Sequence, residues 1–184
     1  MSTRDLACLA LALVAGGCAS MAANPSATEG PNLGSDATPA QIAGWDISVG
    51  PDGIGLPPGK GTSATGAIVY EQKCQACHGA KGGGQPNDRL VGGQGTLASK
   101  APVRTIGSYW PYATTLYDYV YRAMPFSAPQ SLTPDEVYSV VAWLLHRNGI
   151  IDEDSVMDAR SLPAVRMPNR DGFIPDPRPE GPVQ

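Results

Sequence analysis

The chain has 184 residues and a formal net charge of −4. This length allows one domain with flanking segments, and the small acidic charge argues against a nucleic-acid partner. The 22 glycines and 18 prolines are concentrated in the two ends, so we expect loops there and one folded body between them.

The first 22 residues (1–22) have the pattern of an export signal. Arg4 precedes an apolar run over residues 6–14, which is too short to span a bilayer. The letters AGGC ending at Cys18 resemble a lipoprotein box, in which Cys18 becomes a lipid anchor. That box normally has leucine where this chain has alanine, and cleavage near Ala22 would instead release a soluble protein. Both alternatives predict an exported, periplasmic protein.

The motif that carries chemistry is KCQACHGAKGGG, residues 73–84. A Cys-x-x-Cys pair alone is consistent with half of a zinc site, a redox dithiol or part of an iron–sulfur ligand set. A histidine directly after the second cysteine indicates covalent attachment of a c-type haem. Cys74 and Cys77 would form thioethers to the two vinyl groups, and His78 would bind the iron as proximal ligand. A zinc site would need further ligands, and the chain has one other histidine, His146.

The body is expected to be mostly helical, since no strand pattern is found around the motif. The best-marked helix begins at Pro134, where Thr133 and Glu136 can form a capping box. Valine and leucine then recur with helical spacing on one face. The apolar positions of that face are Val137, Val140, Val141, Leu144 and Leu145.

Two further helices are expected, over residues 65–73 and 111–123. In the first, the small residues Gly66 and Ala67 would let another helix approach closely, with Tyr70 one turn later on the same face. A body of this size has little core of its own, and a covalent macrocycle would supply much of the missing apolar centre.

These elements predict a cytochrome domain over residues 65–150 with an extended segment on each side. The N-terminal arm, residues 23–64, is rich in Gly, Pro, Ser and Thr, and Trp45 and Ile47 are its expected anchors on the body. The C-terminal tail, residues 151–184, has few apolar residues. We expect it to lie on the body as an extended strap.

Methionine is the predicted sixth ligand of the iron. Met124 precedes a proline, which disfavours helical backbone and extends the chain across a haem face. Met157 fits a gap-filling core methionine better, and Met167 lies in the polar tail. His146 falls on the helix face opposite the apolar one, at ~100° per residue, which argues against a ligand role.

With His78 and Met124 both bound, the iron has no position for a substrate. Such an iron suits outer-sphere electron transfer and does not suit oxygen or peroxide chemistry. A labile Met124 would permit a peroxidase-like side activity. A haem enzyme with an open site therefore remains an alternative function, ranked below electron transfer.

The helix, haem motif, methionine loop and final helix together resemble a class I cytochrome c. A closer resemblance, to the cytochrome subunit of the Sox sulfur-oxidation system (the SoxD family), extends through both flanks. The stretches that carry it are WDISVGPDGIGLPPG (45–59), GGQGTL (92–97), TIGSYWPYATTLYDYVYRAMPF (105–126), SLTPDEVYSVVAWLLHRNGII (131–151) and MPNRDGF (167–173).

The resemblance implies a partner subunit with a molybdenum cofactor. That subunit would oxidise a sulfur compound by two electrons, and the cytochrome would pass these electrons one at a time to a downstream cytochrome or oxidase. Some members carry a second haem domain, whereas this chain has one haem motif. A freely diffusing or membrane-tethered electron shuttle is the second alternative. Arg104, Tyr109 and Trp110 are candidates for propionate or haem-edge contacts. The cations that would steer an acidic partner are Lys73, Lys81, Arg89 and Lys100.

Overall fold

The computed structural model describes residues 33–174. The predicted signal with Cys18, and the end of the tail from residue 175, lie outside the described residues. The chain divides into a unit up to Ile42 and a larger unit from Ala43 onward. Helix α2 (Pro39–Trp45) spans this limit and has no buried residue. No helix in the described part is long and apolar enough to cross a membrane.

Helix α6 (Pro134–Arg147) is the centre of the larger unit. Its predicted capping box is present: the Thr133 amide donates to Glu136 Oε2 at 2.7 Å, and the Glu136 amide donates to Thr133 Oγ1 at 3.3 Å. Every residue from Val137 to Leu145 is buried. The expected apolar face is therefore confirmed, but the other faces of the helix are covered as well.

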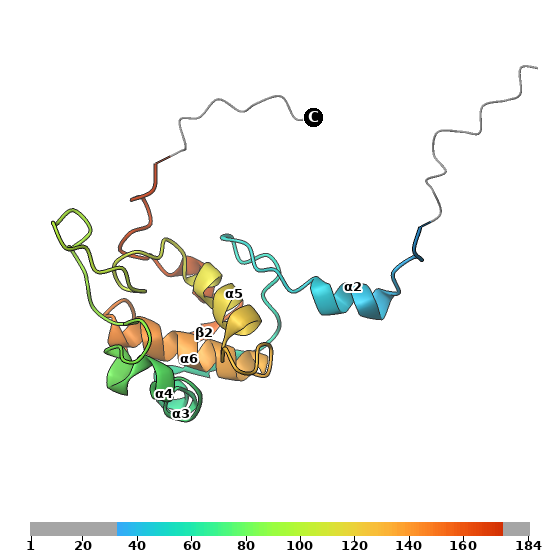
Figure 1. Cartoon of the computed structure of the whole chain (residues 1–184), viewed down its shortest axis with the longest axis horizontal. Coiled ribbons are helices and arrows are strands. Elements are labelled where there is room, and N and C mark those ends of the chain that lie inside the picture. Colours follow the sequence, from blue (N-terminus) through green and yellow to red (C-terminus); the bar gives the residue numbers. More distant parts are fainter. Residues whose placement is uncertain (1–32, 175–184) are drawn as a thin grey trace, which may run out of the picture. The chain divides into compact units, whose positions relative to one another are not determined.

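Helices α3 (Ser63–Lys73) and α5 (Ala113–Ala123) pack against α6, which lies between them in Figure 1. The close approach predicted at Gly66 is confirmed, because a Cβ there would overlap the carbonyl oxygen of Ser139. One turn later the Tyr70 ring stacks on Trp143, with ring centroids 4.0 Å apart. The start of the haem motif is thus fixed to the central helix.

The two flanks of the helical body meet in a short antiparallel sheet. Strand β1 (Lys60–Thr62) pairs with β2 (Val156–Asp158), with Gly61 opposite Met157. A 3-10 turn, η2 (Leu162–Ala164), follows. The described tail is a strap, as predicted, but Leu162 and Met167 lie fully in the core. The core therefore extends beyond the predicted limits of the cytochrome domain, residues 65–150.

Of the two anchors expected in the N-terminal flank, Ile47 is half-buried, whereas Trp45 is 84% exposed. The predicted role of Trp45 as an anchor is therefore wrong. Val49 is buried instead, and its amide donates to the Asp118 carboxylate on α5 at 2.8 Å. A backbone hydrogen bond thus holds this flank where an aromatic side chain was expected to do so.

Candidate functional site

The Cys-x-x-Cys-His motif forms one helical turn, α4 (Gln75–His78). The Cys74 carbonyl accepts the amides of Cys77 at 3.1 Å and His78 at 2.9 Å. The turn ends at Gly79, whose φ of +74° favours glycine. The Tyr70 hydroxyl donates to the Gly79 carbonyl at 2.8 Å. Both cysteines and the histidine are therefore presented by a single turn that is tied to α3 at each end.

The two cysteines differ in burial, and neither forms a disulfide. Cys74 is half-buried, and this desolvation, with a smaller contribution from the nearby Cys77, raises the pKa of its thiol to about 11. A redox dithiol depends on a thiol of lowered pKa, so this environment disfavours that alternative. A neutral thioether carries no charge and suits the partly buried Cys74 position.

His78 is oriented by a backbone carbonyl. Its Nδ1 lies 2.8 Å from the Asp88 carbonyl oxygen. Because a carbonyl only accepts, Nδ1 carries the proton and Nε2 keeps the lone pair that a metal ligand needs. Within residues 33–174 no three His, Cys, Asp or Glu side chains come together that could hold a metal ion. This orientation is compatible with the predicted role of His78 as an iron ligand through Nε2, and that role stays a prediction.

Met124 ends helix α5. Its backbone is extended, with φ −121° and ψ 145°, as predicted for a residue before proline. Its amide closes the helix by donating to the Val120 carbonyl at 3.0 Å. The side chain is partly buried against the hydrophobic core. Of the methionines within residues 33–174, Met157 and Met167 are both buried in that core, whereas Met124 is only partly buried, and its role as a ligand stays a prediction.

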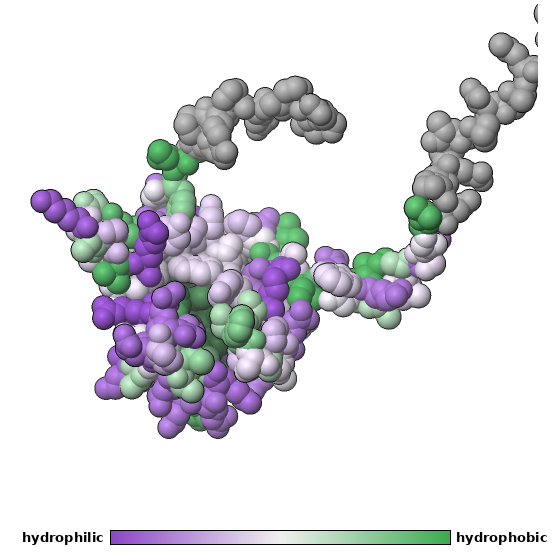
Figure 2. Space-filling model, viewed as in Figure 1, coloured by the Kyte–Doolittle hydropathy of each residue, from purple (hydrophilic) through white to green (hydrophobic). Residues whose placement is uncertain are grey.

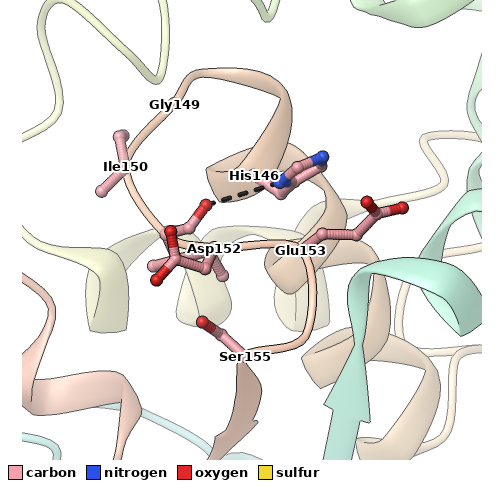
Figure 3. Close-up of a pocket in the computed structure, with 7 residues that line it drawn as sticks. His146, Gly149, Ile150, Asp152, Glu153 and Ser155 are labelled. Carbon is pink, nitrogen blue, oxygen red and sulfur yellow. Dashed lines mark hydrogen bonds between the residues drawn. The ribbon is translucent and has the colours of Figure 1, made fainter.

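The second histidine lies at a separate pocket at the end of α6 (Figure 3). The pocket has a volume of about 390 Å³, and His146 borders it together with Asp152 and Glu153. His146 Nδ1 is 3.4 Å from the Ile151 carbonyl oxygen. Nothing in this geometry brings His146 into the predicted ligand set.

The residues proposed for propionate contacts lie in the loop before α5. The Arg104 guanidinium carbon is 5.7 Å from the centre of the Tyr109 ring. Trp110 packs edge-on against Tyr119, with centroids 5.6 Å apart. Figure 2 shows apolar residues, in green, within a hollow on the face of the body that faces the viewer. The role of these three loop residues stays a prediction.

Two residues at the site were missed by the sequence analysis. Asp88 contributes only its carbonyl oxygen, which any residue could supply, so no sequence signal could have found it. Asn148 precedes Gly149 at the end of α6, where asparagine is an ordinary helix-end residue. Its contacts with the loop after the haem motif depend on tertiary structure.

Comparison with known proteins supports a cytochrome. The family described as "Cytochrome C oxidase, cbb3-type, subunit III" matches residues 61–144. A solved chain titled "Crystal Structure of the Sulfane Dehydrogenase SoxCD from Paracoccus pantotrophus" is 45% identical, with a TM-score of 0.77. That match covers 81% of this chain and 74% of the other. The chain belongs to the SoxD family of c-type cytochromes. No curated protein matches it significantly.

Membership of the SoxD family confirms two predictions. The fold is that of a class I cytochrome c with flanking segments, as the mostly helical architecture also shows. The chain is a haem electron-transfer subunit, because a cytochrome c domain implies haem c. The individual haem-binding residues of this SoxD-family chain remain predictions from its motif and geometry.

Proposed function

We propose that the chain is a monohaem cytochrome that relays single electrons as the haem subunit of a periplasmic, molybdenum-dependent sulfane or sulfite dehydrogenase in sulfur (thiosulfate) oxidation. The observation that carries the proposal is the 45% identity, over 81% of the chain, to a chain of sulfane dehydrogenase SoxCD. The single haem motif, on the turn α4, supports one haem.

The residues of the α4 turn attach the cofactor. The thiols of Cys74 and Cys77 would hold the haem by addition to its vinyl groups, a reaction that leaves the oxidation state unchanged because sulfur bonds to one carbon and hydrogen to the other. His78 Nε2 and the Met124 sulfur would be the protein ligands of the iron. When bound, haem supplies an iron that gains or loses one electron.

The chain's role beside the iron is to keep its surroundings fixed. The Asp88 carbonyl holds the His78 ring, and the end of α5 holds Met124 in extended backbone. If His78 and Met124 both bind the iron, no position would be left on it for substrate. The molybdenum-cofactor subunit would therefore perform the two-electron oxidation, and a downstream cytochrome or oxidase would accept the electrons.

Exposed side chains near the site support contact with protein partners. Lys73, Lys81 and Arg89 are all exposed around the motif and would steer an acidic surface towards it. Phe126, two residues after Met124, is 84% exposed.

A second candidate function is a membrane-tethered electron shuttle without a dedicated dehydrogenase partner. The sequence AGGC at Cys18 favours it, because lipoprotein modification there would anchor the chain. Purification from periplasm and membranes separates the two proposals. A stable complex with a molybdenum subunit supports the first, and a lipidated chain purified alone supports the second.

The proposal is tested by the optical spectrum of the purified haem-loaded protein, oxidised and reduced, with Met124→Ala beside it. Wild type should keep its haem after denaturation and show the weak long-wavelength band of methionine–iron ligation. Met124→Ala should lose the band, and its reduction potential should fall because thioether ligation raises it.

Met157→Leu is the matched control, since Met157 is a buried core methionine, and it should keep the band. A Met124→Ala protein that keeps the band would refute the ligand assignment. A wild-type protein that releases its haem on denaturation would refute attachment through Cys74 and Cys77.

A further inference from the structure

Asn148 joins the end of α6 to the loop that follows the haem motif. Its side chain is nearly completely buried, with 7% of the residue exposed. The side-chain oxygen accepts the Gly92 amide at 3.0 Å. The side-chain nitrogen donates to the carbonyls of Leu90 at 3.2 Å and Leu144 at 2.8 Å. Every hydrogen that this amide can donate is therefore used, and one side chain bridges the loop and the helix.

The loop held by Asn148 also carries the carbonyl that orients His78. On the side before Asp88, the Asn87 amide donates to the Cys77 carbonyl at 2.8 Å. On the side after it, the amides of Leu90 and Val91 donate to the Gly82 carbonyl at 2.9 and 3.1 Å. These bonds join the loop to the haem motif itself, so the loop and the motif could move together without breaking them.

The Asn148 contacts differ from these local bonds because Asn148 is the C-cap residue of α6, the most buried helix of the described structure. Its two bonds to the loop, at Leu90 and Gly92, begin two residues after Asp88. The Asn148 backbone carbonyl also accepts from Gln94 Nε2 at 3.0 Å, which ties the loop to the helix a third time. Asn148 thus holds the loop to the end of the central helix. The loop has further contacts with the body: the Leu90 side chain packs on the core, and the Thr105 hydroxyl donates to the Gly92 carbonyl.

We propose that Asn148 is a positioning residue that fixes the Asp88 carbonyl against His78 and so sets the donor strength of the axial imidazole. A hydrogen bond from Nδ1 raises the basicity of a histidine ligand, and a more basic ligand favours the oxidised iron. Loosening the loop would weaken this bond and raise the reduction potential. The inference rests on the proposed function, because it requires His78 to bind the iron.

The test is Asn148→Leu in the full-length haem-loaded protein, since leucine has a similar shape and adds no charge. We expect the oxidised-to-reduced ratio at a fixed potential to fall about threefold, a rise of about 30 mV. In the reduced protein, solvent exchange of the His78 Nδ1 proton, followed by NMR, should become at least about tenfold faster.

Thr114→Val is the matched control, since valine has nearly the same shape as threonine. Thr114 is also a buried polar residue whose side chain donates to a loop carbonyl, that of Pro51 at 3.0 Å, but this loop carries neither Asp88 nor a residue proposed to contact the haem. The control should leave the potential and the His78 proton unchanged. If Asn148→Leu lowers only the melting temperature and leaves both readouts at their wild-type values, Asn148 is merely structural and the proposal is overturned.

A measurement on wild type keeps the proposal testable if Asn148→Leu does not fold. The Gly92 amide and the His78 Nδ1 proton should have opening constants within about tenfold of one another, after correction for their intrinsic exchange rates. If the Gly92 amide opens more than about tenfold more readily than the His78 Nδ1 proton, the loop separates from Asn148 without releasing His78. That result would also overturn the proposal.

Failure of the proposed function gives a different result. A wild-type spectrum without low-spin, histidine-ligated iron would overturn the function and this inference together. A wild-type protein with His78 bound, whose potential is insensitive to Asn148→Leu, would overturn the inference alone.

Discussion

Helix α6 and the turn α4 belong to the same unit but are held in different ways. Every residue of α6 from Val137 to Leu145 is buried, whereas α4 has no buried residue. The turn keeps its shape through hydrogen bonds to backbone carbonyls, such as those from Tyr70 to Gly79 and from His78 to Asp88. The scaffold is therefore held mainly by apolar burial, whereas the site region depends on its hydrogen bonds and on its connections to that scaffold.

The connections between the two regions are few and specific. Gly66 brings α3 against Ser139, the Tyr70 ring stacks on Trp143, and the Asn148 side chain holds the loop. Changes at these connections should affect both regions. Changes deep in the scaffold should lower stability and leave the haem site intact.

The largest effect is expected at the crossing of α3 and α6. Gly66→Ala places a Cβ onto the Ser139 carbonyl oxygen and within 2.7 Å of the Trp143 Cβ, so the helices must separate. Overpacking of this kind should cost about 3 kcal/mol of unfolding free energy, measured by denaturant unfolding of the haem-loaded protein. Gly44→Ala in α2 is the control, because its Cβ meets nothing within 4 Å, and it should not destabilise. Equal stability of Gly66→Ala and wild type would show that the crossing is not tight.

A smaller effect is expected in the strap. Met167 is 1% exposed, and Met167→Ala should cost about 2 kcal/mol through lost burial and a residual cavity. The wavelength and intensity of the methionine–iron band should not change, because Met167 is not a predicted ligand. Ile174→Ala in the same segment should cost almost nothing, since Ile174 is exposed. Loss of the band in Met167→Ala would mean that the strap and the site are not separable.

The smallest effect at neutral pH is expected at Tyr138, whose buried hydroxyl donates to the Pro57 carbonyl at 2.9 Å. Tyr138→Phe should cost about 1 kcal/mol at pH 7. Burial, and secondarily the charge of Asp158, raise the pKa of Tyr138 from 10.0 to about 12. The folded state therefore keeps a proton that the unfolded state loses between pH 10 and 12, so wild type loses stability as pH rises through this range.

The Tyr138→Phe protein lacks this titration. The difference in stability between wild type and Tyr138→Phe should therefore become smaller between pH 9 and 12 in thermal unfolding experiments. Tyr119→Phe, at an exposed position, should follow the wild-type curve. A deficit that stays constant with pH would contradict the raised pKa.

The sequence predicted those features that are encoded over a few neighbouring residues. The capping box at Thr133 and Glu136, the extended backbone at Met124 and the close approach at Gly66 are all confirmed. Each follows from local backbone preference or from the absence of a side chain, so a short window of sequence is sufficient.

Features that depend on distant partners were missed or mistaken. Trp45 looked like an anchor because it is large and apolar, but nothing in the sequence says whether a core surface is available to it. Met167 lies in a proline-containing tail without periodicity, and its burial follows from the position of the strap. Asn148 and Asp88 meet only because α6 and the loop after the motif are neighbours in space.

The pairing of β1 with β2 has a consequence for the order of assembly. Gly61 and Met157 pair with one another although helices α3 to α6 lie between them in the sequence, so forming the sheet closes a long loop of chain. Contacts within the Cys-x-x-Cys-His turn, by contrast, join near neighbours. Because long loops close more slowly than short ones, we expect the turn to form while the sheet is still open. Pulsed hydrogen exchange would show this as late protection of the sheet amides. The turn that carries the haem motif would then be in place before the strap closes over the core.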